Sequence, residues 1–231
     1  MDVNQSSLLL SLMALSLGAR HGFDLDHLAT IDAITRTVRE HRFLSKIVGF
    51  LFSLGHGIIV TLISIIIGSG LIQSRVPEWL EVFGTWVSMI FLFLFGFLNL
   101  WTIFQNPTHG ALPSGIKSYL AKKIFNRSFN PCLIMFIGAL FAFSFDTFSQ
   151  VALFSLSASV LAGWLFSGVL GLIFMVGMML SDGLNGFFVS TLIQRADRLS
   201  LFLSRSLGLA ISLFSIVLGV ITLVKMIRYT S

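Results

Sequence analysis

The sequence is short of charge: only 11% of its 231 residues are Asp, Glu, Lys or Arg, whereas 55% are hydrophobic. A soluble domain carries about 25% charged residues, so this chain has too little polar surface to cover a globule in water. Several stretches reach the roughly 18 residues with few or no charges that indicate a membrane-spanning helix. We therefore expect a single integral membrane domain over residues 1–231.

Other scarce features exclude further classes of protein. The lone cysteine, Cys132, cannot form an intramolecular disulfide. Residues 1–7 contain no Lys or Arg, so we expect no signal peptide. The net charge of +5 does not indicate nucleic-acid binding, because basic residues of membrane proteins mark cytoplasmic loops. The P-loop pattern is missing, so direct use of ATP would need another subunit.

Six apolar stretches predict an all-α, polytopic bundle of about six transmembrane helices. They cover Leu8–Ile34, Phe43–Ile72, Trp79–Phe104, Cys132–Leu156, Val160–Thr191 and Leu199–Ile227. The first, second and fifth stretches are longer than the roughly 20 residues that a straight helix needs. Polar residues interrupt them, which favours broken or tilted helices.

Basic residues are concentrated on one side of this predicted bundle. Three alternate connections, the last extended into the start of the sixth span, hold eleven of the fifteen Lys and Arg residues: Arg36, Arg39, Arg42, Lys46, Lys117, Lys122, Lys123, Arg127, Arg195, Arg198 and Arg205. By the positive-inside rule this side is cytoplasmic. Both termini are then expected on the outer, periplasmic side.

The cytoplasmic linker 105–131 divides the spans into two halves, 1–104 and 132–231, of three spans each. The first span of each half crosses in the opposite direction, which is typical of an inverted-repeat transporter with a site near the bilayer midplane. Four identities recur at a spacing of 120 residues: Gly18/Gly138, Ala19/Ala139, Phe23/Phe143 and Asp26/Asp146. A 3+3 inverted repeat is therefore predicted, with chance matches in a chain rich in Phe and Gly as the alternative.

The segment Arg20–His27 carries the most information, because it interrupts an apolar stretch with two histidines and two aspartates. An ionised side chain at the bilayer centre costs about 2.5–3.5 kcal/mol, so such groups persist mainly where they pair, bind an ion or line a wet pathway. Imidazoles and carboxylates are also ligands that divalent transition metals favour. The segment therefore predicts a membrane protein that handles a metal.

An ideal helix places His21, Asp24 and His27 within about one third of its circumference, while Asp26 points away. Either the helix unwinds near the glycines at 18 and 22, or Asp26 faces another partner. We predict His21, Asp26 and His27 as metal ligands and Asp24 as a secondary ligand or pathway residue. We predict Arg20 as a structural charge partner. The competing interpretation is a structural network in which Asp24 or Asp26 pairs with Arg20 and the histidines cap loops.

Three further polar patches lie within predicted spans. His56 lies between two glycines, and beside the first cluster we favour a metal-ligand role over a helix–helix hydrogen bond. Asp146 has no basic residue nearby, so its partner must come from another helix or from a cation. Asp182 and Asn185 each precede a glycine and predict a discontinuous helix that lines a cavity. We predict Asp146, Asp182 and Asn185 as secondary pathway or ligand residues; polar contacts between helices are the alternative.

These four patches, in this order, resemble the motifs of the nickel/cobalt transporter family (NiCoT). His21, Asp26 and His27 match its signature H-x-x-x-x-D-H, and Arg20 and Asp24 fit the longer form R-H-x-x-D-x-D-H. Residues 54–56, 145–147 and 177–186 are similar to its L-G-H, L-G-F-D-T-A-T-E and G-M-x-x-x-D-T-x-D-G motifs. The resemblance covers residues 18–186. Two motif carboxylates are neutral amides here, at Gln150 and Asn185, and family members usually have eight spans.

The resemblance implies uptake of a divalent metal ion by a secondary transporter of a prokaryotic inner membrane. Neutral imidazole suits Ni²⁺, whose affinity for such ligands exceeds that of Co²⁺ in the usual divalent order. Ni²⁺ is therefore the first candidate and Co²⁺ the second. The expected partners are this ion and the lipid bilayer, with no nucleic acid and no prosthetic group.

Four other functions compete with uptake. A metal exporter or a related anion carrier would have the same topology. Exporters often carry a histidine-rich cytoplasmic loop, and 105–131 holds only His109. A membrane metalloenzyme is disfavoured because five histidines are too few for the histidine boxes of diiron enzymes, and the H-E-x-x-H pattern of zinc proteases is missing. An accessory subunit for metalloenzyme maturation is the last alternative. We expect a transporter and not an enzyme.

Overall fold

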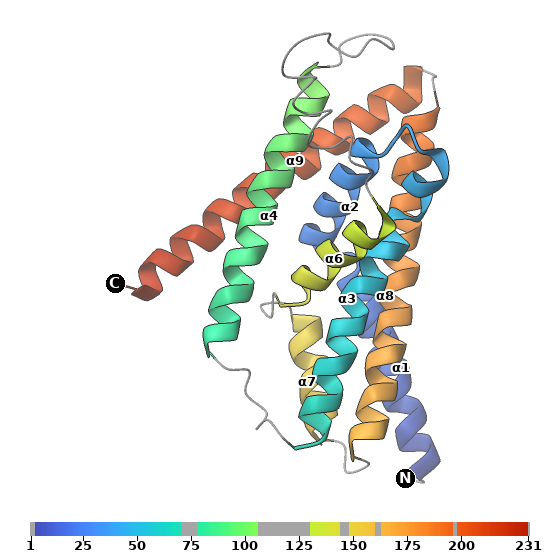
Figure 1. The fold of residues 1–231 in the computed structure, drawn as a ribbon, viewed down its shortest axis with the longest axis vertical. Coiled ribbons are helices and arrows are strands. Elements are labelled where there is room, and N and C mark those ends of the chain that lie inside the picture. The colour runs from blue at the N-terminus through green and yellow to red at the C-terminus, as the bar shows by residue number, and fades with distance from the viewer. Residues whose placement is uncertain are drawn as a thin grey trace.

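The computed structural model describes residues 3–70, 78–105, 130–143, 148–159, 163–195 and 198–230, and all regular structure in these ranges is helical. The helices, shown in Figure 1, are α1 (Val3–His21), α2 (Leu25–Thr37), α3 (Arg42–Gly68), α4 (Glu78–Gln105), α6 (Pro131–Phe141), α7 (Phe148–Ser159), α8 (Gly163–Gln194) and α9 (Arg198–Thr230). The linker 105–131 lies almost entirely outside the described residues, as does Asp146.

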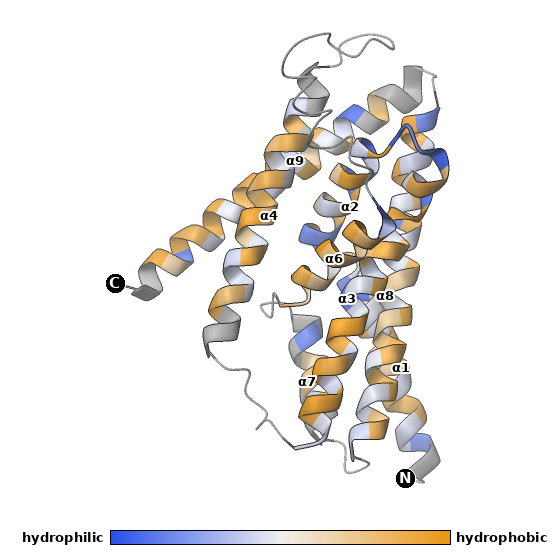
Figure 2. Ribbon diagram, in the orientation of Figure 1, coloured by the Kyte–Doolittle hydropathy of each residue, from blue (hydrophilic) through white to orange (hydrophobic). Residues whose placement is uncertain are grey.

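Helices α3 and α8 form the centre of the bundle and run in opposite directions (Figure 1). Both are long and apolar enough to cross a membrane, as is Arg205–Ile227 within α9. Most helical residues are apolar by type (Figure 2), and many large apolar side chains, such as Leu184 and Phe188, are exposed. Such extensive apolar exposure is tolerated against lipid but not in water. The predicted all-α membrane bundle is confirmed.

The first predicted span consists of two helices. Helix α1 ends at His21, and the next three residues form a turn in which the Phe23 amide donates to the Arg20 carbonyl at 3.0 Å. Asp24 is extended and precedes α2. Gly22 is needed here, because a Cβ at this position would collide with the hydroxyl of Ser181 on α8. The chain therefore unwinds at Gly22, which is one of the two outcomes that the sequence left open.

The fourth predicted span is divided as well, although the sequence did not indicate it. Helix α6 begins with Asn130 as its N-cap, whose side chain accepts from the Cys132 amide, and with Pro131 in the first turn. It ends at Phe141, and α7 begins at Phe148. Residues 144–147 between these helices lie outside the described part of the chain.

The discontinuous helix expected near Asp182 and Asn185 is wrong, because α8 is one helix that passes through both residues. The second span, for which a broken or tilted helix was expected, is also one continuous helix, α3, which passes through His56. Continuous helix keeps the backbone hydrogen bonds inside the segment, which is the favoured state in lipid. A Cβ at Gly183 would meet nothing within 4 Å, so no packing demand forces the helix to open there.

Close helix contacts repeat between the two halves. Gly18 of α1 lies against the backbone of Phe174 on α8, too close for a Cβ. Its counterpart 120 residues later, Gly138 of α6, lies equally close to the backbone of Phe52 on α3, and Phe174 follows Phe52 by 122 residues. The contact α1–α8 is therefore reproduced as α6–α3 when the halves are exchanged.

A second pair of contacts is related by the same exchange of the two halves. Gly177 of α8 lies against the backbone of Leu15 on α1, and Gly55 of α3 lies against the backbone of Met135 on α6. Leu15 and Met135 are again 120 residues apart, and Gly55 and Gly177 are 122 apart. Figure 1 shows α1 and α2 running in the opposite direction to α6 and α7. These contacts are those of an inverted repeat.

The contact between α4 and α9 is also consistent with an inverted repeat. A Cβ built on Gly96 of α4 would lie 3.0 Å from Ile216 of α9, and one built on Gly219 of α9 would lie 3.1 Å from Phe93 of α4. Gly219 follows Gly96, and Ile216 follows Phe93, by the same 123 residues. Exchanging the two halves therefore maps the α4–α9 contact onto itself.

The buried apolar residues form two clusters. We call the first apolar cluster the set Ala14, Val60, Ile67, Ala142, Leu153, Phe154, Leu170, Phe174 and Met178. We call the second apolar cluster the set Ile31, Ala33, Ile34, Val38, Val48, Phe52, Ile134, Ile137 and Phe141. The interrupted first span and the central helix α3 contribute residues to both clusters.

Candidate metal site

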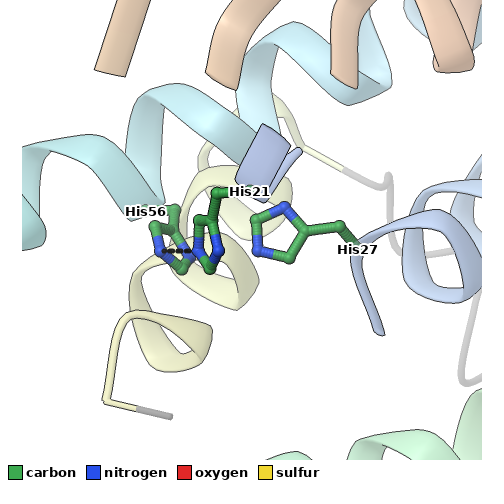
Figure 3. Close-up of side chains that lie close together, drawn as sticks. All are labelled: His21, His27 and His56. Atoms are coloured by element: carbon green, nitrogen blue, oxygen red, sulfur yellow. Dashed lines mark hydrogen bonds between the residues drawn. The ribbon is translucent and has the colours of Figure 1, made fainter. Parts of the chain in front are cut away.

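Three fully buried histidines meet at the interruption of the first span. His21 is the last residue of α1, His27 lies in the first turns of α2, and His56 lies in the middle of α3. One ring nitrogen from each lies within 4.8 Å of the others. Figure 3 shows the rings of His21 and His56 side by side and the ring of His27 directed toward them. Because the chain unwinds between His21 and His27, both side chains can point to one place.

Two carboxylates orient two of these rings. Asp24 accepts from Nδ1 of His21 at 2.8 Å, and Asp182 of α8 accepts from Nδ1 of His27 at 2.9 Å. The Ser53 hydroxyl donates to the same Asp182 oxygen at 2.6 Å. A carboxylate behind a histidine fixes which nitrogen carries the proton and is the usual companion of metal-binding histidines. In this tautomer, Nε2 of His21 and of His27 carries the lone pair.

The third histidine is held by a glutamine. Nε2 of His56 lies 3.2 Å from Nε2 of His21 and 3.3 Å from the side-chain nitrogen of Gln150. That nitrogen also donates to the Ala142 carbonyl at 3.2 Å, which fixes the orientation of the amide. An amide NH₂ can only donate, so Nε2 of His56 accepts. Nε2 of His56 has a single lone pair, so a cation bound there would replace the hydrogen bond from Gln150, and it would also offset the repulsion with the Nε2 lone pair of His21 3.2 Å away.

The spacing suits one metal ion after a small movement. Nitrogen–metal bonds of about 2.1 Å to two nitrogens 3.2 Å apart enclose an angle of about 100°, near the right angle of square-planar or octahedral sites. All three nitrogens lie within 4.8 Å of one another, and two such bonds can span at most roughly 4.2 Å. Any separation beyond that span would have to close around the ion.

The remaining predicted site residues occupy other positions. Asp26 lies in the first turn of α2, where its side chain accepts from the His27 amide at 3.0 Å, and it is not part of the three-histidine group. Asp24 contacts Arg20 at 3.9 Å as well as His21, so the predicted charge pair is present. Asn185 lies one turn after Asp182 on α8. Asp146 lies outside the described residues.

Several buried polar residues had no signal in the sequence. Ser53 precedes the L-G-H motif and resembles any other helix serine until α8 is placed beside α3. Gln150 stood out only as a departure from the family motif. Asp32, which is buried, and Arg36, which is partly buried, form an ion pair at 2.9 Å within α2, and their spacing of four residues is compatible with such a pair. The contacts of Ser53 and Gln150 join different helices, so they do not follow from any single segment of the sequence.

Comparisons with known proteins agree on one family. The family model NicO, described as "High-affinity nickel-transport protein", matches residues 7–230. The chain is 35% identical to the high-affinity nickel-transport protein NixA of Helicobacter pylori over 204 residues, which cover 77% of this chain and 61% of that protein. It is 31% identical to the nickel transporter NixA of Staphylococcus aureus over 206 residues, 77% of this chain and 60% of that protein.

A cobalt transporter is more distant. The chain is 27% identical to the cobalt transport protein NhlF of Rhodococcus rhodochrous over 205 residues, which cover 77% of this chain and 58% of that protein. No solved structure matches the chain. The chain spans about three fifths of the length of the two nickel transporters named above. Because the family model covers almost the whole sequence, the chain belongs to the NicO family, whose model is described as that of high-affinity nickel-transport proteins.

Proposed function

We propose that this protein carries Ni²⁺ into the cell across a prokaryotic inner membrane, with Co²⁺ as the second candidate substrate. It acts as a secondary transporter, multi-pass in the bilayer, with both termini on the periplasmic side. Names of its relatives support nickel as the substrate class. The same names support transport rather than catalysis, and we assign the chain no enzymatic activity.

The observation that carries the proposal is the group of three buried imidazoles. His21, His27 and His56 bind the ion through neutral ring nitrogens, while Asp24 and Asp182 orient the first two rings from behind. Three buried imidazoles inside an apolar bundle are costly without a ligand, because each needs a partner for both nitrogens. Asp26 is assigned a local role at the start of α2 in place of the direct ligation that the sequence favours.

The charges support a divalent ion. Two carboxylates, Asp24 and Asp182, lie directly behind the neutral imidazoles, so their two negative charges match the two positive charges of Ni²⁺. Arg20 lies 3.9 Å from Asp24, but its side chain is 54% exposed and water screens its charge. The site thus offers near-neutral binding to a divalent cation, which lowers the cost of holding the ion in the membrane.

A proton gradient is one available source of energy. Imidazoles must be deprotonated to bind a metal, so protons and Ni²⁺ compete for the same nitrogens. The P-loop pattern is missing from the sequence, so transport that is driven directly by ATP would need another subunit. We therefore assign the chain to secondary transport.

Reconstituted vesicles test the proposed function. Purified protein in liposomes should take up radioactive nickel saturably, and His21→Ala, His27→Ala and His56→Ala should each reduce uptake at limiting nickel by about 100-fold or more, beyond the losses typical of outer-shell residues. His41→Ala is the matched control, because His41 is exposed in the connection before α3. Wild-type uptake in all three variants would remove the site, and no uptake by the wild type would remove the function.

A further inference from the structure

The histidine group lies between the two apolar clusters. Along the first span, Ala14 of the first cluster precedes His21, whereas Ile31 of the second cluster follows His27. Along α3 the order is reversed, as its opposite direction requires: Val48 of the second cluster precedes His56, and Val60 of the first cluster follows it. Both segments therefore cross from one cluster to the other at the level of the histidines.

The other broken span changes cluster at the same point. Ile137 and Phe141 at the end of α6 belong to the second cluster, whereas Ala142 and Leu153 belong to the first. Gln150, which contacts His56, belongs to this same segment. The described structure thus closes the histidine group on both sides with tightly packed apolar side chains.

One phenylalanine from each cluster packs directly on a histidine ring. The ring of Phe174, from the first cluster, lies 5.4 Å from that of His21. The ring of Phe52, from the second cluster, lies 4.9 Å from that of His27 in an edge-to-face contact. Both phenylalanines are fully buried, with no exposed surface.

These two phenylalanines are also counterparts in the inverted repeat. Each contributes the backbone against which a glycine of the other half packs, Gly18 against Phe174 and Gly138 against Phe52. In a transporter built from inverted repeats, each half can adopt the conformation of the other. When the two halves swap conformations, the site opens to the other side of the membrane. Counterpart residues on opposite sides of a central site are therefore expected to perform the same task on opposite faces.

We propose that Phe52 and Phe174 are the two gates of the transport pathway, each blocking access to the histidine group from one side of the membrane. This inference rests on the proposed function. An apolar constriction excludes water and hence a hydrated divalent ion, so one closed gate is a sufficient barrier. The described structure has both gates closed, and transport requires them to open one at a time.

Two barriers in series predict a specific pattern of leakage. Phe52→Ala and Phe174→Ala should each slow saturable nickel uptake in liposomes but leave the membrane tight, because the other gate remains. The double variant should let nickel pass down its gradient without saturation, at least roughly tenfold faster than the wild type at high nickel concentration. Phe52→Leu with Phe174→Leu keeps apolar bulk at both positions and should stay tight.

The matched control removes buried volume elsewhere in the same clusters. Ile134→Ala with Leu153→Ala takes one fully buried side chain from each cluster and should not produce a leak. The proposal would be overturned if either single variant, Phe52→Ala or Phe174→Ala, leaked as much as the double variant. It would also be overturned if the double variant stayed tight or if the control leaked equally. Uptake by wild-type liposomes tests the proposed function separately. If the wild type takes up nickel saturably and the double variant does not leak, the gate proposal is overturned while the proposed function stands.

Discussion

Asp182 lies 155 positions after His27 in the chain and contacts its ring, and its side chain is fully buried, whereas that of Asp24 is 19% exposed. Asp182→Asn preserves the shape and can still accept from His27, but it removes the negative charge behind that ring. We expect nickel affinity to fall about 10–100-fold, the usual effect of losing an outer-shell partner. Equilibrium binding of nickel to the purified variant measures this.

Asp26→Asn is the matched comparison for that experiment. Its side-chain oxygen would still accept from the His27 amide, and the residue lies outside the histidine group. We expect its effect on nickel affinity to be several times smaller than that of Asp182→Asn. A larger loss at position 26 than at position 182 would contradict the ligand assignment and restore Asp26 as a direct ligand.

Gln150 places a neutral amide, and not a carboxylate, beside His56. Gln150→Glu would place a carboxylate about 3.3 Å from the His56 nitrogen, in addition to Asp24 and Asp182. We expect nickel to bind roughly tenfold more tightly and to leave more slowly, so that both KM and the maximal rate of uptake fall. Flux measured over a range of nickel concentrations checks both quantities. Unchanged kinetics would show that position 150 does not influence the ion.

At the residue scale, the structure brings together three histidines that the sequence singled out, but their arrangement could not be predicted. His21, His27 and His56 were predicted because imidazoles inside an apolar span are rare and costly. The direction of Asp26, the hydrogen bond from Ser53 and the contact of Gln150 depend on how α3, α7 and α8 pack, which no local pattern contains. Their roles at the metal remain predictions.

At the scale of helices, the glycines that bring the segments together give the sharpest test. Gly18→Ala and Gly138→Ala would each drive a methyl group into the backbone of the facing helix, at Phe174 and at Phe52 respectively. Overpacking of this kind costs about 1–3 kcal/mol, and the inverted repeat predicts similar losses for the two variants. Thermal unfolding in detergent measures both.

Gly183→Ala is the control, since a Cβ there meets nothing within 4 Å. In a continuous helix this change should be neutral or should raise stability by up to about 1 kcal/mol. A clear loss of stability at Gly183 would indicate that α8 is interrupted there, as the sequence suggested. Unequal responses of Gly18→Ala and Gly138→Ala, with one variant unaffected, would contradict the repeat.

The spans could be predicted from hydropathy to within a few residues, but their interruptions could not. Glycines beside polar residues indicated a break at Gly22 and, wrongly, another near Gly183. The surroundings of the two glycines differ: a Cβ at Gly22 would collide with Ser181, whereas one at Gly183 would meet nothing within 4 Å, and no local pattern contains this difference. A glycine permits a break but does not demand one, because the alternative is a helix with all its hydrogen bonds made.

At the scale of the whole molecule, the chain is a multi-pass membrane protein of the NicO family. Its helix contacts follow an internal repeat of two halves. Four sequence identities at a spacing of 120 predicted this repeat, and three pairs of glycine contacts now follow the same exchange. The repeat is nevertheless broken at the centre, because His21 has Phe141 as its counterpart. A single site is therefore built from unequal halves.

Competition with protons should be visible for the whole protein. Because nickel binds only to deprotonated imidazole, we expect nickel affinity to fall as the pH falls, and protons to be released when nickel binds near neutral pH. Calorimetric titration in buffers of different ionisation enthalpy measures the number of protons released. Binding that is equally tight at pH 5 and at pH 7.5 would contradict a site made of histidines.

The most direct test of the central claim is X-ray absorption at the nickel edge of the nickel-loaded protein. We expect a single nickel ion with three imidazole ligands, and one imidazole fewer in each of His21→Ala, His27→Ala and His56→Ala at saturating nickel. A nickel environment of oxygen ligands only, unchanged in the three variants, would show that the histidines do not hold the transported ion.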